Sequence, residues 1–271
     1  MPMIPDAYIS EIFSSIQGEG LYVGRRQVFV RFCGCNLACR YCDTSGSRQS
    51  APQCRVEVQP GSGAGNTIPN PVSAESLSEI VGRFARAARH HSVSLTGGEP
   101  LLHADFIRGW LLRMQAEGER TVRPYGSQAK GRPHGGPTGG LSVHLETNGT
   151  LPRELEKLIG LIDVVVMDIK LPSVTGQDAC FGEHLRFLHV AAHRTEVFVK
   201  VVFGECTPDS ELAEVARTLS RVNHTIPVVL QPLTGPGAPG PRRILAAQTL
   251  LARELPNVLV IPQMHKQMRV E

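Results

Sequence analysis

Cys35-Asn-Leu-Ala-Cys39-Arg-Tyr-Cys42 places three cysteines on one short loop with the spacing C-x3-C-x2-C. The loop follows residues 27–32, a β-branched and aromatic run that predicts a strand. Three thiolates this close together can bind three irons of a [4Fe–4S] cluster and leave the fourth iron open to a small molecule. A zinc site is the alternative, because thiolates serve either metal, and it needs a fourth ligand such as Cys33 or a histidine.

Strands and helices are predicted to alternate along the chain outward from this loop. Residues 163–168 form a nearly unbroken apolar run, typical of a buried parallel strand. The other predicted strands are residues 92–95, 141–146, 195–203, 226–231 and 257–261, and the predicted helices are residues 73–90, 105–114, 151–161, 181–193, a helix with Thr207 as N-cap and Pro208 in its first turn, and residues 241–254. With about six or seven βα repeats, the chain is predicted to form an α/β fold with a full or partial (βα) barrel. An open doubly wound sheet is the alternative.

Two segments rich in Gly and Pro, residues 45–71 and 117–140, interrupt this alternation. They lack apolar periodicity, so we expect surface loops inserted into the domain rather than linkers between domains. The chain of 271 residues is then a single domain, residues 1–271, and is long enough to bury a full core.

The composition is that of an ordinary globular protein, with 41% hydrophobic and 20% charged residues. A net charge of +3 is too small to favour nucleic-acid binding by bulk charge. The sequence contains no apolar run of about 18 residues that could span a membrane, and no basic segment followed by an apolar core as in a secretory signal. We therefore expect a cytoplasmic protein, in which clustered cysteines bind metal and the scattered Cys54, Cys180 and Cys206 are bystanders.

Polar motifs follow the predicted strands. TGGEP at residues 96–100, ETNG at 146–149, DIK at 168–170 and Gln231-Pro232 each come where a strand ends. Because such ends share one rim in a βα barrel, we expect these motifs to converge on one site near the cysteines.

The TGGEP motif suits a ligand that carries both charges of an amino acid. The paired glycines let a ligand approach the backbone, whose N–H groups can bind a carboxylate, and Glu99 can bind an ammonium group.

Together, the cysteine loop and TGGEP resemble the radical S-adenosylmethionine (SAM) superfamily. Within it, EIFSSIQGEG at residues 11–20, Arg31-Phe32, Cys42-Asp43-Thr44 and the ending QMHKQMRVE at 263–271 resemble the 7-carboxy-7-deazaguanine synthase family. This resemblance implies a partial (βα) barrel of the radical SAM type, with a [4Fe–4S] cluster, SAM and Mg2+. It also implies a lyase that converts 6-carboxy-5,6,7,8-tetrahydropterin to 7-carboxy-7-deazaguanine and ammonia by radical ring contraction, in the biosynthesis of queuosine and other 7-deazapurines.

The resemblance assigns roles to individual residues. It implies that the cluster ligands are Cys35, Cys39 and Cys42 and that Thr44 is a magnesium ligand. It implies cofactor contacts for Tyr41, Asp43, Gly98, Glu99, Asp168, Lys170, Gln231 and Pro232. It implies substrate contacts for Ile16, Gln17, Gly18, Glu19, Arg31, Thr96 and Glu271. A guanidinium such as that of Arg31 suits a substrate carboxylate, which it can bind through two hydrogen bonds.

The resemblance further implies a homodimer and an electron donor such as flavodoxin or ferredoxin, without a direct nucleic-acid or membrane partner. Two alternatives stay open. The DIK and ETNG motifs are also similar to those of glycyl-radical-activating enzymes, which act on a partner protein, although Gln17-Gly18-Glu19, Arg31 and His265-Lys266 argue against this group. The other alternative is a zinc-stapled protein without catalytic activity, which would contain zinc and no iron.

Overall fold

The computed structural model describes residues 4–116 and 140–270. These residues form a ten-stranded sheet in the order β10-β9-β8-β7-β6-β5-β2-β1-β3-β4. The strands are β1 Ile9–Ile16, β2 Arg26–Phe32, β3 Gln53–Glu57, β4 Gly65–Pro69, β5 Ser92–Gly97, β6 Ser142–Thr147, β7 Val164–Ile169, β8 Glu196–Phe203, β9 Val228–Pro232 and β10 Val258–Val260. Adjacent strands pair in parallel from β2 through β5, β6, β7, β8 and β9 to β10. On its other side, β2 pairs antiparallel with β1.

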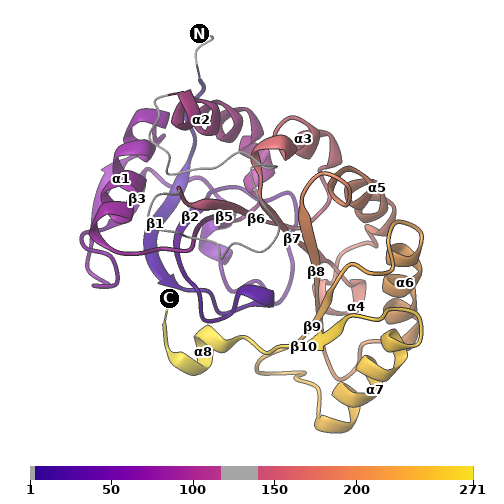
Figure 1. The fold of residues 1–271 in the computed structure, drawn as a ribbon. Helices are drawn as coiled ribbons and strands as arrows, with labels where there is room; N and C mark the ends of the chain where they lie inside the picture. The colour runs from indigo at the N-terminus through magenta and orange to yellow at the C-terminus, as the bar shows by residue number, and fades with distance from the viewer. Residues whose placement is uncertain (1–3, 117–139, 271) are drawn as a thin grey trace.

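The sheet bends into an incomplete barrel with the helices along its outer side (Figure 1). The helices are α1 Ala74–Ala87, α2 Ala104–Ala116, α3 Pro152–Glu156, α4 Pro172–Thr175, α5 Phe181–Ala191, α6 Asp209–Ser220, α7 Pro241–Ala252 and α8 Met264–Met268. Strands β4 and β10 stand at opposite ends of the strand order, so the barrel stays open. The predicted α/β fold with a partial (βα) barrel is confirmed, and the doubly wound alternative, with helices on both faces, is not the observed arrangement.

The two-residue alternation of each strand separates the two faces of the sheet. On β7, Val165, Met167 and Ile169 belong to the main hydrophobic core, which includes the buried faces of the outer helices. The alternate residues Val164 and Val166 form a second, smaller cluster on the inner face with Phe198 of β8 and Val229 of β9. Apolar side chains therefore fill the inner face toward the start of these strands.

Polar side chains follow on the same inner face toward the strand ends. Asp168 lies two residues after Val166, Lys200 two residues after Phe198, and Gln231 two residues after Val229, and all three line a cavity. The alternating pattern thus places an apolar floor beneath a polar chamber.

The segment 45–71 was predicted to be a surface loop, but it contains regular secondary structure. It forms a short 3-10 helix at Ser45–Arg48 and the antiparallel hairpin β3–β4, and β3 pairs in parallel with β1. Cys54 and Val56 are buried in the main core, and these two side chains attach the hairpin to the domain. The second predicted insertion, residues 117–140, lies outside the described residues except for Gly140.

The helix boundaries also needed correction at two places. The predicted helix 151–161 divides into α3 and a 3-10 helix at Ile159–Leu161. Helix α6 begins at Asp209 with Pro208 as N-cap, and the Thr207 hydroxyl instead accepts a hydrogen bond from the Gly204 amide at 2.9 Å. The cap is therefore one residue later than predicted.

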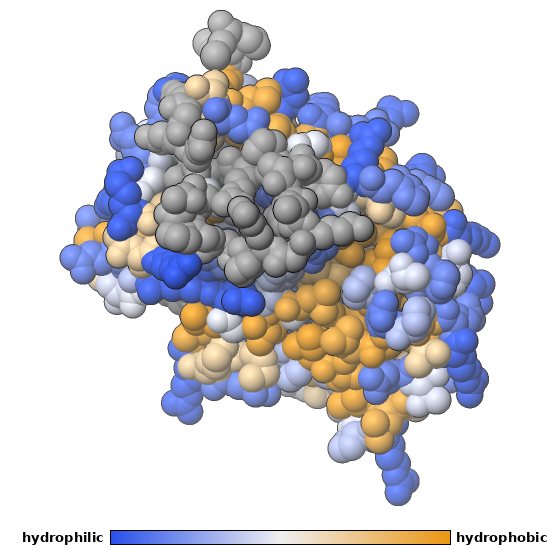
Figure 2. Space-filling view, viewed as in Figure 1, coloured by the Kyte–Doolittle hydropathy of each residue, from blue (hydrophilic) through white to orange (hydrophobic). Residues whose placement is uncertain are grey.

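In the space-filling view, apolar side chains gather where β8, β9 and β10 lie (Figure 2). Leu259 on the edge strand β10 is among the exposed large hydrophobic residues. Within residues 4–116 and 140–270, the helices lack the combination of length and apolar character needed to cross a lipid bilayer.

Candidate active site

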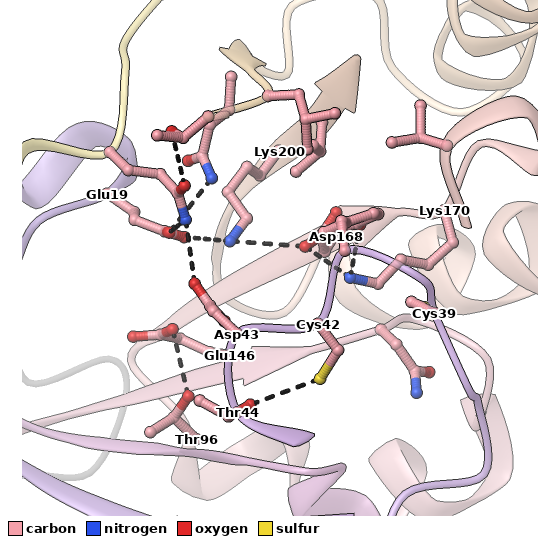
Figure 3. A pocket seen from close by; sticks show the side chains of 18 of the residues that line it. Glu19, Cys39, Cys42, Asp43, Thr44, Thr96, Glu146, Asp168, Lys170 and Lys200 are labelled. Carbon is pink, nitrogen blue, oxygen red and sulfur yellow. Dashed lines mark hydrogen bonds and ion pairs between the residues drawn. The ribbon is translucent and has the colours of Figure 1, made fainter. Parts of the chain in front are cut away.

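A cavity of about 810 Å3 opens at the carboxyl ends of the parallel strands, where the polar motifs were predicted to converge. Its wall is built from segments that follow most of the strands and from the C-terminal segment (Figure 3). It is lined by the predicted residues Ile16, Gln17, Gly18, Glu19, Arg31, Cys35, Cys39, Tyr41, Cys42, Asp43, Thr44, Thr96, Gly98, Asp168, Lys170 and Gln231. Glu99 and Pro232 do not line it, and Glu271 lies outside the described residues.

The cysteine loop is fastened to the segment that follows β7. The Arg40 amide donates a hydrogen bond to the Thr175 carbonyl at 3.0 Å, and the Ala38 amide donates to the Gln177 side chain at 3.3 Å. From the other side, the Arg48 guanidinium donates to the Cys39 carbonyl. The loop makes these contacts through its backbone groups, and its three cysteines line the cavity.

Among the described residues, these thiols are not gathered closely enough to form a ready-made site for a single zinc ion. A tetrahedral zinc ion holds its sulfur ligands about 3.8 Å apart. Among the described residues, the only group of three such ligand atoms within 4.8 Å of one another is Glu19, Asp43 and His265, which contains no cysteine. Cys33, the proposed fourth zinc ligand, is buried and does not line the cavity.

Burial raises the pKa of the Cys35 and Cys39 thiols. Metal binding needs the thiolate forms, so loading of iron must displace thiol protons.

Gly97 at the end of β5 and Gly98 directly after it bring this strand end against the start of the cysteine loop. Gly97 has a φ of 125°, which only glycine adopts readily, and the Gly98 amide donates to the Phe32 carbonyl at 3.0 Å. A Cβ atom at Gly98 would overlap the Gly34 carbonyl, so a side chain is excluded here. Both glycines line the cavity and let a ligand approach the backbone.

Glu99 occupies a different place from the one expected for a group that binds ammonium. Its side chain is fully buried and accepts hydrogen bonds from Thr147 Oγ1 at 2.8 Å, the Asn148 amide at 2.8 Å and the Leu101 amide at 3.0 Å. Glu99 therefore connects the TGGEP turn to the ETNG turn. Its partner Thr147 lies 48 residues further along the chain. Burial raises the pKa of this carboxyl.

A row of alternating charges crosses the cavity wall (Figure 3). Lys170 Nζ donates to Tyr41 OH at 3.1 Å and pairs with Asp168 at 2.8 Å. Lys200 Nζ lies 3.4 Å from the same Asp168 and also pairs with Glu19. The row connects the cysteine loop with the segment at residues 16–19.

These ion pairs keep Glu19 ionised. Burial acts to raise the pKa of this carboxyl, but the charge and hydrogen bond of Lys200 and the Gln263 amide outweigh it, and the pKa falls to about 2. The charges of Glu19 and Asp168 in turn hold the pKa of Lys200 above its usual range despite burial.

Two buried acceptor atoms are left for a ligand. Asp168 Oδ1 and Gln231 Oε1 have no hydrogen-bond partner among the described residues, although both side chains line the cavity. Buried polar atoms are nearly always paired in folded proteins. These two atoms can therefore accept hydrogen bonds from the hydroxyl or amino donors of a ligand.

The opposite wall combines a cation with a stacked aromatic pair. Phe13 and Phe29 stack with their ring centroids 5.1 Å apart, and the Arg31 guanidinium lies 5.5 Å from the Phe13 centroid. Glu11 accepts from Arg31 Nε at 2.6 Å and lies 3.6 Å from Arg55 of β3. Glu11 therefore orients the guanidinium of Arg31, which lines the cavity.

Glu146 belongs to the site, although the sequence analysis assigned it no role. It accepts from Ser94 Oγ at 2.7 Å, Gln17 Nε2 at 2.9 Å and Thr96 Oγ1 at 3.3 Å. Gln17 also accepts from the Glu19 amide, so its side chain supports the site more than it faces a ligand. The position of Glu146 directly after a predicted strand was the available indication.

The C-terminal segment covers the Gln17-Gly18-Glu19 turn. The Met264 amide donates to the Gly18 carbonyl at 2.8 Å, and a Cβ at Gly18 would overlap His265. Gln263, His265, Lys266 and Val270 all line the cavity. The sequence pattern predicts no role for His265 and Lys266 beyond their place in the family motif.

An open βα barrel with three cysteines at the mouth of its cavity defines the class of protein. Residues 29–219, more than half of the chain, match the Radical SAM superfamily. The crystal structure of QueE from Escherichia coli has the same fold, with a TM-score of 0.56 and 19% identity over 96% of this chain and 95% of that one. A radical SAM methyltransferase from Sphaerobacter thermophilus is similar over 88% of this chain and 66% of its own, with a TM-score of 0.55 and 17% identity.

Curated relatives specify the particular enzyme. The chain is 39% identical to the 7-carboxy-7-deazaguanine synthase of Geobacter sulfurreducens, with 97% of each protein covered. It is 33% identical to the enzyme of the same name from Methanothermobacter thermautotrophicus, with 96% of each covered. The chain belongs to the 7-carboxy-7-deazaguanine synthase family, as the sequence resemblance predicted. This result favours a lyase that acts on a small molecule over both alternatives.

Proposed function

We propose that this enzyme converts 6-carboxy-5,6,7,8-tetrahydropterin to 7-carboxy-7-deazaguanine and ammonia at the cavity described above. The observation that carries the proposal is that one cavity joins the three-cysteine loop to Arg31 and Glu19, the groups suited to a carboxylated pterin. The family assignment supports the same reaction.

In this proposal, Cys35, Cys39 and Cys42 hold a [4Fe–4S] cluster. When bound, the cluster and SAM supply the electron transfer and hydrogen abstraction typical of the superfamily. The exposed backbone at Gly97 and Gly98 accommodates the methionyl end of SAM.

The charged row binds the remainder of SAM. Asp168, through its unpartnered Oδ1, and Gln231, through its unpartnered Oε1, accept hydrogen bonds from ribose or adenine donors. Lys170 and Tyr41 hold Asp168 in place beside the cysteine loop.

The substrate lies on the other side of the cavity. Arg31 binds the substrate carboxylate through its terminal nitrogens, because Glu11 already engages Nε. Glu19 and Glu146 accept hydrogen bonds from the amino and N–H groups of the pterin edge. Lys200 keeps Glu19 ionised, so Glu19 acts as an acceptor at neutral pH. Ile16 and Thr96 complete this wall.

Magnesium is proposed to bind next to the cluster loop. Thr44 and Asp43 offer the hard oxygen ligands that Mg2+ prefers. Thr44 Oγ1 lies 3.8 Å from Cys42 Sγ, so a cation bound by Thr44 would lie close to the cysteine loop.

The walls of the cavity are expected to keep water away from the reacting groups. The apolar floor of Val164, Val166, Phe198 and Val229 closes one side of the chamber, and the segment at residues 263–270 covers part of the other. A dry chamber protects reactive species from side reactions.

The decisive experiment is anaerobic reconstitution with iron and sulfide, followed by SAM, Mg2+, dithionite and 6-carboxytetrahydropterin. We expect mass spectrometry to detect conversion of the pterin with loss of ammonia. Release of 5′-deoxyadenosine without conversion would keep the radical chemistry and refute the substrate. A colourless preparation with stoichiometric zinc would refute both.

We also propose a homodimer reduced by a flavodoxin or ferredoxin, as the family resemblance implies. A cytoplasmic location is supported by the seven cysteines, all of which are free thiols, as expected in a reducing compartment.

A further inference from the structure

Gln263 lies directly before α8, and its side-chain amide is bonded on every side. Nε2 donates to Glu19 Oε1 at 2.7 Å and to Asp43 Oδ2 at 3.2 Å. Oε1 accepts from Lys266 Nζ at 2.5 Å and from Thr234 Oγ1 at 3.0 Å. An amide offers two donors and a carbonyl oxygen with two lone pairs, so this side chain uses its full capacity.

The two acceptors of Gln263 belong to opposite parts of the active site. Glu19 follows β1 on the wall assigned to substrate, whereas Asp43 directly follows Cys42 of the cysteine loop. Carboxylate oxygens of these two residues lie within 4.8 Å of each other and of a His265 nitrogen. Two like charges at this distance repel, and a shared donor between them offsets the repulsion.

The lysines nearby do not duplicate this link. Lys200 contacts Glu19 and Asp168, while Lys266 lies 3.6 Å from Asp43. Among the described residues, Gln263 is the side chain whose hydrogen bonds reach Glu19 and Asp43 together.

We propose that Gln263 is a positioning residue that fixes the substrate-binding Glu19 against the cysteine loop. It thereby holds the substrate at a set position relative to the cofactor, so that cofactor cleavage leads to product. The inference rests on the proposed function, because it uses the substrate role of Glu19. Gln263 acts through Glu19 and Asp43 and does not react itself.

The test compares Gln263→Met with Gln248→Met in the full-length, cluster-loaded enzyme. Methionine keeps the length of glutamine and removes its hydrogen bonds. Gln248 is a matched control, because this α7 glutamine donates to the Val258 carbonyl and does not line the cavity. For Gln263→Met we expect the KM for the pterin to rise about tenfold or more, the size expected for a lost hydrogen bond to a charged group. We also expect more 5′-deoxyadenosine per product, with unchanged iron content.

A second readout does not depend on turnover. Amide hydrogen exchange of the peptide covering residues 262–270, measured on the protein without substrate, should be faster in Gln263→Met and unchanged in Gln248→Met. Gln263→Glu should raise KM further, because it sets a third carboxylate beside Glu19 and Asp43.

Two results would overturn the role of Gln263. One is an unchanged KM and 5′-deoxyadenosine ratio in Gln263→Met. The other is an equal loss in Gln248→Met, which would indicate a general effect on the C-terminal part of the fold. Failure of the wild-type enzyme to convert the pterin would instead refute the proposed function. Unchanged hydrogen exchange of residues 262–270 in Gln263→Met would refute the proposal that Gln263 anchors the C-terminal segment to Glu19 and Asp43.

Discussion

Glu19 shows how much a buried ion pair can change one residue of the cavity. Its pKa of about 2 lies below the ordinary value of 4.5, so the unfolded chain binds this proton more readily than the folded one. Stabilisation by ionised Glu19 is therefore complete above about pH 4.5 and is lost as the pH falls toward 2.

Substitution Glu19→Gln tests this pH dependence. The variant should have a lower unfolding free energy than the wild type, and this difference should be greatest at pH 7. It should become smaller between pH 4.5, the ordinary pKa of Glu19, and pH 2, its pKa in the folded protein. Urea unfolding of both proteins at pH 7, 4 and 3 provides the measurement. A difference that stays constant over this range would contradict the assigned ionisation.

Substitution Cys35→Ser should abolish assembly of the cluster, because a serine hydroxyl is a poor ligand for iron compared with a thiolate. We expect the iron content after reconstitution and the broad visible absorption to fall to background. Cys54→Ser is the control, because Cys54 is buried in the core away from the cavity, and it should retain its iron. Wild-type iron content in Cys35→Ser would show that Cys35 is not a ligand.

The place of a residue in the fold was predictable where it belongs to a motif at the end of a predicted strand, and less so where a partner distant in the sequence holds its side chain. The cysteines and Arg31 lie on the cavity as expected. Glu99 does not, because its carboxylate meets Thr147 and Asn148, which only the folded sheet brings near. Lys200 lies in the middle of an apolar strand, and its inward direction depends on the strand register.

Among the elements, the hairpin β3–β4 has an identifiable structural task. Glu57 at the end of β3 is buried, and it accepts from the Ser14 amide of β1 at 2.9 Å and from the Gly63 amide at 2.8 Å. Arg55 of the same strand supports Glu11, which orients Arg31. The segment that interrupts the βα pattern thus braces the wall assigned to substrate.

Substitution Glu57→Gln should lower the unfolding free energy by about 1–3 kcal/mol, the cost of leaving a buried donor unpaired. The reason is that the new amide group directs N–H donors at a backbone N–H. Urea unfolding at pH 7 measures the loss. The matched control Glu156→Gln, on the exposed side of α3, should stay within about 0.5 kcal/mol of wild type, and an equal loss in both variants would contradict the bracing role.

The elements predicted correctly have regular apolar patterns of their own. Strand β7 was recognisable as a nearly unbroken apolar run, and helix α1 because its buried residues recur at helical spacing. Strand β4 has mostly exposed residues, and β1 received no prediction. Both owe their strand structure to pairing with neighbours, which a single sequence does not display.

Over the whole molecule, the cavity is assembled from parts more than 200 residues apart. Gln263 and Glu19 are in direct contact although 244 positions separate them. A ligand in this cavity therefore binds the complete fold and not a fragment of it, so its binding free energy adds to the global stability.

Saturation with SAM should raise the unfolding temperature of the cluster-loaded enzyme. At about 100 times the dissociation constant, binding adds about 2.7 kcal/mol, which corresponds to a rise of roughly 5–10 °C for a domain of this size. Anaerobic differential scanning calorimetry measures the shift. Cys35→Ser should respond much less, since it lacks the cluster, and an equal shift in both proteins would place the SAM site elsewhere.

The position of the C-terminal segment has a practical consequence for handling the protein. Val270 lines the cavity, and helix α8 lies against the turn at Gly18. An affinity tag or fluorescent fusion attached behind helix α8 would stand close to that opening and compete with entry of the reactants. Ile4 packs against the main hydrophobic core and does not line the cavity, so the amino-terminal side of the chain is the attachment point that spares the opening.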